Sequence, residues 1–144
     1  LVGIHTGGVW VAEALHALLG LTTPLASIDV SFHRDDHRIG NGLKAGGRVT
    51  HLPDTVEGAH LVVVDDVLYT GRTIRAAIET LFDYGRPARI QLAVVADRGH
   101  RELPIRADYV GKNLPTARGE RVQVQLAELD GVDQVLLVPA QEPR

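Results

Sequence analysis

The chain has 144 residues, of which 44% are hydrophobic and 23% are charged, and it contains no cysteine. This length suits a single domain with its own core, and the lack of thiols excludes disulfides and thiolate metal sites. No apolar run approaches the roughly 18 residues that a membrane span needs, and no signal-peptide pattern is present. We therefore expect one cytoplasmic domain over residues 1–144, without a membrane partner. Because the sequence opens without Met and begins directly in a strand-like run, we also expect a preceding N-terminal piece.

Short apolar strands alternate with helical patterns along the chain. Apolar residues at helical spacing predict helices over 9–19 and 73–84, which stop at Gly20 and Gly85. Strands are predicted at 1–4, 25–32, 61–64 and 90–96, with weaker patterns at 108–110, 122–126 and 135–138. This alternation favours an α/β fold with a mainly parallel central sheet flanked by helices. Ligands of such sheets bind beyond the carboxyl ends of the strands.

The segment from Ser31 to Leu52 interrupts this alternation. It contains four glycines and few residues suited to a core. A polar excursion of this length in a compact domain is usually functional or disordered. We interpret it as a flexible flap hairpin over about 31–52, and a tolerated surface insertion is the alternative.

The strongest chemical signal is the run from Leu61 to Thr73. An apolar strand ends there in two adjacent carboxylates, and a Thr-Gly-Arg-Thr stretch then opens a helix. Free N–H groups at a helix N-terminus bind phosphate, and Gly71 lets the backbone approach an anion closely. Asp65 and Asp66 repel phosphate, but they can accept hydrogen bonds from sugar hydroxyls or help to hold Mg²⁺. The arrangement therefore suits a phosphorylated sugar.

The plain alternative is that these polar residues are only turn and N-cap residues. One capping group would be unremarkable, but two acids directly after a four-residue apolar strand are harder to explain in that way. The run is not a Walker A loop, because the Gly-x-x-x-x-Gly-Lys-Ser/Thr pattern is absent. It is not a Gly-x-Gly-x-x-Gly dinucleotide loop either.

The run from Val62 to Thr73 resembles the ribose-phosphate-pyrophosphate signature of type I phosphoribosyltransferases. Further stretches narrow the resemblance to one family: Ser31–Asp36, Tyr84–Pro87, Gln91–Asp108 and Gly111–Asn113. They resemble the bacterial bifunctional regulators of the pyrimidine-biosynthesis operon, which are uracil phosphoribosyltransferases and UMP-responsive RNA-binding attenuation proteins. The resemblance covers nearly the whole chain and is weakest at 37–54 and after residue 125. It implies the type I phosphoribosyltransferase fold.

The resemblance also implies a site for 5-phosphoribosyl-1-pyrophosphate (PRPP) and for UMP. The two acids would bind the ribose hydroxyls, and 70–73 would bind the 5-phosphate. The implied catalytic residues are Asp65, Asp66 and Arg34. The implied PRPP- and UMP-binding residues are Thr6, Gly7, Gly8, Val64, Asp65, Asp66, Val67, Leu68, Tyr69, Thr70, Gly71, Arg72, Thr73 and Lys112.

The stretch from Gly3 to Gly8 would be the pyrophosphate loop. It departs from the family pattern, which has basic residues where His5 and Gly7 stand, and Arg34 in the flap would supply the missing charge. Taken alone, Thr6 to Gly8 is typical of an ordinary strand-to-helix turn. The implied cofactor is Mg²⁺ carried mainly by the pyrophosphate, so no metal ligand of the chain is assigned.

Lys112 and the backbone of 109–111 would form the base pocket, with Lys112 donating to a pyrimidine carbonyl. Taken alone, a single Lys is more often simply solvated.

Positive charge is concentrated in one part of the chain. The net charge is −3, whereas the stretch from Arg98 to Arg121 holds six Arg and Lys against three Asp and Glu. A basic stretch can act on phosphates within an acidic chain, but a solvated surface loop is the default interpretation. The resemblance implies RNA contact by His100, Arg101 and Arg106, with the mRNA leader of a pyrimidine operon as the RNA. It also implies a homodimer or higher oligomer.

Three functions remain open on the sequence. The first is a uracil phosphoribosyltransferase, making UMP and pyrophosphate from uracil and PRPP, which also binds mRNA in a UMP-dependent way. The second is an RNA-binding, nucleotide-sensing regulator with little or no catalysis, which His5 and Gly7 favour. The third is a phosphoribosyltransferase for another base.

Overall fold

The computed structural model describes residues 1–30, 50–53 and 55–139. Most of the predicted flap, including Arg34, therefore lies outside the described residues. Within the described ranges no helix is long and apolar enough to cross a membrane.

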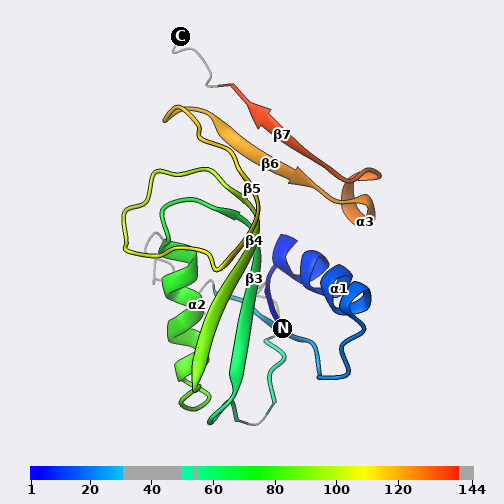
Figure 1. Ribbon diagram of the computed structural model, residues 1–144, viewed down its shortest axis with the longest axis vertical. Coiled ribbons are helices and arrows are strands. Elements are labelled where there is room, and N and C mark those ends of the chain that lie inside the picture. Colours follow the sequence, from blue (N-terminus) through cyan, green and yellow to red (C-terminus); the bar gives the residue numbers. More distant parts are fainter. Residues whose placement is uncertain (31–49, 54, 140–144) are drawn as a thin grey trace, which may run out of the picture.

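Five parallel strands form the central sheet of the described chain, in the order β2-β1-β3-β4-β5. Their bounds are β1 (Val2–Ile4), β2 (Ala26–Ile28), β3 (His60–Leu68), β4 (Arg89–Asp97) and β5 (Tyr109–Asn113). Helices α1 (Gly7–Leu19) and α2 (Arg72–Phe82) cover opposite faces of this sheet (Figure 1). The predicted α/β fold with a mainly parallel sheet is confirmed.

Strand β3 is longer than the sequence pattern predicts. The apolar run ends at Val64, but the strand continues through both acids, because Val67 and Leu68 still pair with Ala96 and Asp97 of β4. Carboxylates are unfavourable in strands on average, and pairing with a long neighbouring strand overrides that preference here. Conversely, β2 is shorter than the predicted strand over 25–32.

The C-terminal strands do not join the central sheet. Strands β6 (Arg121–Gln125) and β7 (Gln134–Val138) pair with each other as an antiparallel hairpin, linked through the short helix α3 (Ala127–Asp130), which was not predicted. The hairpin lies near the carboxyl ends of β3 and β4 (Figure 1).

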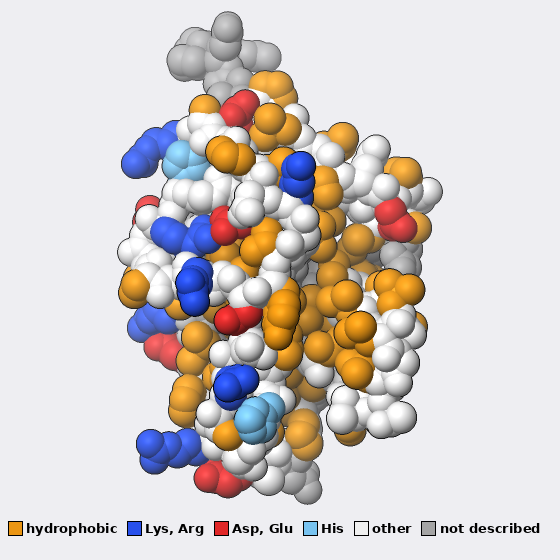
Figure 2. All heavy atoms as spheres, viewed as in Figure 1, with side chains coloured by type: hydrophobic (Ala, Val, Ile, Leu, Met, Phe, Trp, Pro, Cys, Tyr) orange, Lys and Arg blue, Asp and Glu red, His pale blue; other side chains and the backbone are white. Residues whose placement is uncertain are grey.

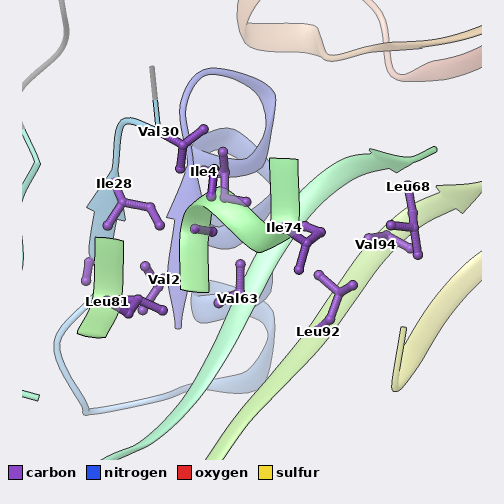
Figure 3. Close-up of a cluster of buried hydrophobic side chains, with 13 residues drawn as sticks. Val2, Ile4, Ile28, Val30, Val63, Leu68, Ile74, Leu81, Leu92 and Val94 are labelled. Carbon is purple, nitrogen blue, oxygen red and sulfur yellow. The ribbon is translucent and has the colours of Figure 1, made fainter. Parts of the chain in front are cut away.

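The hydrophobic core lies between α2 and the sheet. Ile74, Ala77 and Leu81 recur on one face of α2 at helical spacing and are buried. Figure 3 shows Ile74 and Leu81 among the buried side chains of β1, β2, β3 and β4. Burying each large aliphatic side chain contributes roughly 1.5–3 kcal/mol, so this layer fixes α2 against the strands that carry the site.

All strand ends that matter for the site meet at one edge of the sheet, because the strands are parallel. Helices α1 and α2 begin at the same edge, since each follows a strand by a short turn. The end of the predicted flap is also anchored to the sheet. His51 exchanges backbone hydrogen bonds of 2.8 and 3.0 Å with Ser27 of β2.

Candidate active site

Two adjacent carboxylates stand near the carboxyl end of β3. Asp65 is buried, with 8% of its surface exposed, and its Oδ1 accepts the N–H of Asp66 at 2.8 Å. The Oδ1 of Asp66 accepts the N–H of Val67, also at 2.8 Å. These bonds orient both side chains, and an ionised carboxylate has further lone pairs with which to accept hydroxyl groups.

The turn from Thr6 to Gly8 lies directly against these acids. A Cβ atom on Gly7 would collide with the carboxylate of Asp66, and one on Gly8 would collide with the carbonyl oxygen of Val64. Only glycine permits this approach. The structure therefore brings the predicted pyrophosphate loop and the predicted sugar-binding acids together, at the N-terminus of α1.

Thr6 is the N-cap of α1 and makes no side-chain capping bond. The preceding His5 donates its backbone N–H to the carbonyl of Ile28 at 3.0 Å, and the peptide bond between His5 and Thr6 is cis. The loop is thus tied to the end of β2 on its other side.

A second helix N-terminus lies beyond the acids, at the start of α2. Gly71 has φ 95°, a left-handed conformation that favours glycine, and the N–H of Arg72 donates to Thr70 Oγ1 at 3.2 Å. Within the described chain, the N–H groups of Thr70, Gly71, Thr73 and Ile74 have no acceptor. Such N–H groups at a helix N-terminus can bind a phosphate, so we call residues 69–74 the phosphate loop after this candidate role.

Arg72 does not add its charge to this phosphate loop. Its Nε lies 2.9 Å from Oε1 of Glu102, so the guanidinium is paired across to the loop that follows β4. Val64, Val67 and Leu68 are strand residues of β3. Tyr69 is partly exposed and stacks on the guanidinium of Arg98, 4.0 Å from the ring centroid.

The basic segment after β4 folds back over the phosphate loop. Arg98 is buried, with 6% of its surface exposed, and donates to the carbonyl of Glu120. His100 Nε2 lies 2.5 Å from the carbonyl oxygen of Thr116. The expectation of a simple solvated basic run is therefore wrong for Arg98, which supports Tyr69 from beneath.

Arg101 is held by three acceptors, whereas Arg106 is exposed. The Arg101 guanidinium donates to the carbonyls of Tyr69 at 2.8 Å and Ile105 at 2.7 Å, and to Asp97 Oδ2 at 2.5 Å. Arg106 makes no ion pair or hydrogen bond with any part of the chain that the structure describes.

Asp97 is a site residue that the sequence patterns missed. It ends β4, accepts the N–H of Gly99 at 3.0 Å, and pairs with Arg101. Burial alone would raise the pKa of Asp97, but the hydrogen bonds from Arg101 and Gly99 and the charge of Arg101 together hold that pKa below its ordinary value of 3.8. An acid at the end of a strand signals this edge of the sheet, but nothing in the sequence identifies its partner.

Lys112 lies two strands away from the acids. It is exposed on β5 and pairs with Ala96 of β4, which in turn pairs with Val67 beside Asp66. With adjacent strands about 4.8 Å apart, Lys112 and β3 are separated by roughly 10 Å. A ribose and a base can span this separation.

Acids, a glycine turn and a helix N-terminus with N–H groups that no acceptor satisfies within the described chain meet at one sheet edge, as a phosphoribosyl transferase domain requires. The family model with that description matches residues 1–128. A hypoxanthine phosphoribosyltransferase from Staphylococcus aureus has the same fold, with a TM-score of 0.66 over 97% of this chain and 74% of that one, at 20% identity. A purine phosphoribosyltransferase from Pyrococcus horikoshii is 27% identical, with a TM-score of 0.59 over 78% of this chain and 68% of that one.

Curated relatives narrow the class to one family. The bifunctional protein PyrR of Listeria welshimeri is 48% identical over 148 residues, which cover 99% of this chain and 81% of the relative. That of Chloroflexus aurantiacus is 52% identical over 142 residues, which cover 96% and 78%. The chain belongs to the PyrR family of phosphoribosyl transferase domains.

Proposed function

We propose that this chain transfers the ribosyl phosphate of PRPP to uracil in the cytoplasm, and that it binds the mRNA leader of a pyrimidine operon when UMP is bound. The observation that carries the first activity is the meeting of Asp65 and Asp66 with two helix N-termini at one edge of the sheet. Membership of a family of bifunctional proteins supports the pairing with RNA binding.

Each part of PRPP has a matching group. The 5-phosphate binds the N–H groups of Thr70, Gly71, Thr73 and Ile74, and the ribose hydroxyls donate to Asp65 and Asp66. The pyrophosphate lies at the turn from Thr6 to Gly8, and the uracil carbonyl accepts from Lys112. Arg34 is assigned to the pyrophosphate from the sequence alone, because it lies outside the described residues.

The reaction is a displacement at the anomeric carbon. Uracil N1 forms the new bond to that carbon and loses its proton to solvent, and the bond to the pyrophosphate oxygen breaks with both electrons leaving on pyrophosphate. Positive charge develops on the sugar ring, and the two carboxylates beside it stabilise that charge. Positioning of the two reactants supplies the rest of the rate acceleration. No covalent nucleophile is assigned.

Mg²⁺ fits this site as an ion brought mainly by the pyrophosphate. Within the described residues no group of three His, Asp or Glu gathers to hold a metal. Mg²⁺ typically takes one or two carboxylates together with substrate phosphates and waters, and Asp65 and Asp66 supply such oxygens. When bound, the ion would neutralise charge on the leaving pyrophosphate.

Pyrophosphate release with three bases tests this activity. With PRPP and Mg²⁺ present, we expect release with uracil and not with hypoxanthine or orotate. Release with another base alone would assign the chain to that base. No release with any base would favour the regulator with little catalysis.

One observation favours that second candidate. The carboxylate of Asp66 occupies the space that a side chain at Gly7 would need, so this loop has no room for a basic side chain unless Asp66 moves. A pyrophosphate here would depend on backbone N–H groups, on Arg34 and on Mg²⁺.

For the RNA, we assign the surface of His100, Arg101 and Arg106. Lys and Arg side chains gather on the side of the molecule that carries α2 and the loop after β4 (Figure 2). Of the three residues, Arg106 is the exposed one, so it is the direct phosphate contact in this proposal. His100 and Arg101 shape the segment that presents it. We also propose a homodimer or higher oligomer, which light scattering tests.

A further inference from the structure

Two consecutive carbonyl groups of the phosphate loop are held by the segment that follows β4. The carbonyl of Tyr69 accepts from Arg101 at 2.8 Å. The next carbonyl, of Thr70, accepts the backbone N–H groups of Glu102 at 2.9 Å and Leu103 at 3.1 Å. Residues 101–103 therefore hold the phosphate loop through the carbonyl groups of Tyr69 and Thr70.

These hydrogen bonds to the loop carbonyls determine the direction in which the N–H groups of the loop point. A peptide unit is planar, and in its trans form the C=O and N–H point in opposite directions. The peptide bonds that join Tyr69, Thr70 and Gly71 are trans. Holding the Tyr69 carbonyl on Arg101 thus aims the Thr70 N–H away from the segment, and holding the Thr70 carbonyl does the same for the Gly71 N–H. These two N–H groups have no acceptor among the described residues.

Two further hydrogen bonds, besides the one to the loop, hold the Arg101 guanidinium in place. Its Nε donates to Ile105 at 2.7 Å, and its second terminal nitrogen donates to Asp97 at 2.5 Å. Asp97 ends β4, and its ion pair with Arg101 and the N–H of Gly99 hold it in place. A planar guanidinium with each nitrogen on its own acceptor has little rotational freedom. The hydrogen bond from Arg101 to Tyr69 therefore ties the phosphate loop to the end of β4.

We propose that Arg101 is a positioning residue of the phosphate loop: it holds the loop backbone so that the Thr70 and Gly71 N–H groups face the 5-phosphate before the ligand arrives. The inference rests on the proposed function only in taking that phosphate as the ligand. Arg101 does not touch the phosphate. It reduces the ordering that binding would otherwise require.

The test compares Arg101→Gln with Arg118→Gln. Arg118 is exposed, makes no hydrogen bond or ion pair with the described part of the chain, and has no proposed role in binding. Both variants remove one positive charge from the stretch 98–121, but only the first removes the bond to the loop. The measurements are calorimetric affinity for ribose 5-phosphate and steady-state KM for PRPP and for uracil, alongside thermal unfolding. For Arg101→Gln we expect about tenfold weaker ribose 5-phosphate binding and a similar rise in KM for PRPP, with KM for uracil unchanged. Arg118→Gln should match the parent in ribose 5-phosphate affinity and in both KM values.

Arg101→Lys covers the case in which the Gln variant does not fold. It keeps the charge, but all its donors sit on one nitrogen, so it cannot replace a guanidinium whose three nitrogens each reach a separate acceptor. It should therefore also weaken ribose 5-phosphate binding, by less than the Gln variant does. Equal losses in Arg101→Gln and Arg118→Gln would overturn the proposal, because the loss would then come from the removed positive charge and not from the bond to Tyr69. A parent that binds ribose 5-phosphate, with Arg101 variants that bind it equally well, would overturn this inference alone. A parent that binds neither ribose 5-phosphate nor PRPP would overturn the proposed function and this inference with it.

Discussion

At the scale of single residues, the sequence predicts those candidate site residues whose type is unusual next to a strand or helix end. Asp65, Asp66 and Gly71 are such residues, because acids after an apolar run and a glycine before a helix have few structural uses, and their roles in binding stay predictions. Asp97 and Arg98 were not, because their roles depend on how the chain folds back after β4. A sequence shows that a charge is present, but not which carbonyl or ring it meets.

Gly71 gives a direct prediction at this scale. Gly71→Val requires a branched residue at φ 95°, and its Cβ would lie 3.1 Å from Ile105 Cγ1. We expect PRPP binding to fall at least tenfold and the melting temperature to drop by a few degrees.

Gly131→Val is the matched control, because Gly131 has φ 79° and open space around its Cα. It should lose stability and keep PRPP affinity. Normal turnover by Gly71→Val would show that the loop binds no phosphate.

Asp97 predicts how stability depends on pH. Its pKa is lowered in the folded protein, so its contribution is complete above the ordinary value of 3.8 and is lost as the pH falls through the folded pKa. Urea unfolding of the parent and of Asp97→Asn should therefore differ most at neutral pH, and the difference should shrink below about pH 4. A difference that stays constant down to about pH 2 would contradict this assignment.

At the scale of elements, hydrophobic periodicity predicted the central strands and both long helices, because each buries a face against the sheet. The extension of β3 through two acids was not predictable, since its cause is pairing with β4. Nor was the separation of β6 and β7 into a hairpin, because alternation does not identify a strand's partner. The flap and Arg34 lie outside the described residues and stay predictions.

At this scale, the packing of helix α2 against the sheet predicts how two substitutions change stability. Leu81 is fully buried, whereas its neighbour Phe82 is 52% exposed. Leu81→Ala should lower the free energy of unfolding by about 2–5 kcal/mol, and Phe82→Ala should change it by less than about 1 kcal/mol. Equal losses in chemical denaturation would mean that α2 packs on a different face.

At the scale of the whole molecule, Lys and Arg side chains gather on one side, with Asp and Glu side chains among them (Figure 2). The loop after β4, which lies on this side, also holds the phosphate loop. Because Arg101 bonds the Tyr69 carbonyl of the phosphate loop, an alanine double variant at His100 and Arg101 should lower uracil turnover as well as RNA binding. UMP bound at the phosphate loop would favour one arrangement of residues 101–103. UMP strengthens RNA binding if RNA binds that same arrangement more tightly.

Arg106 therefore separates the two activities. Arg106→Ala should leave uracil turnover unchanged and weaken binding of a structured pyrimidine-leader RNA. It should also flatten the slope of log affinity against log salt by roughly one unit. Salt-titrated filter binding with and without UMP measures this. An unchanged slope would exclude Arg106 as a phosphate contact.

The most direct test of the central claim, that the run from β3 into α2 holds PRPP, is a calorimetric titration of Mg²⁺-PRPP into the parent, Asp65→Asn and Asp66→Asn. Asn keeps the Oδ1 acceptor that each carboxylate offers to the following N–H, so both variants should fold. Loss of a charge-assisted bond to a ribose hydroxyl, about 1.5–3 kcal/mol, predicts roughly tenfold to a hundredfold weaker binding in each. Parent-like PRPP affinity in both variants would contradict the claim and remove these acids from the site.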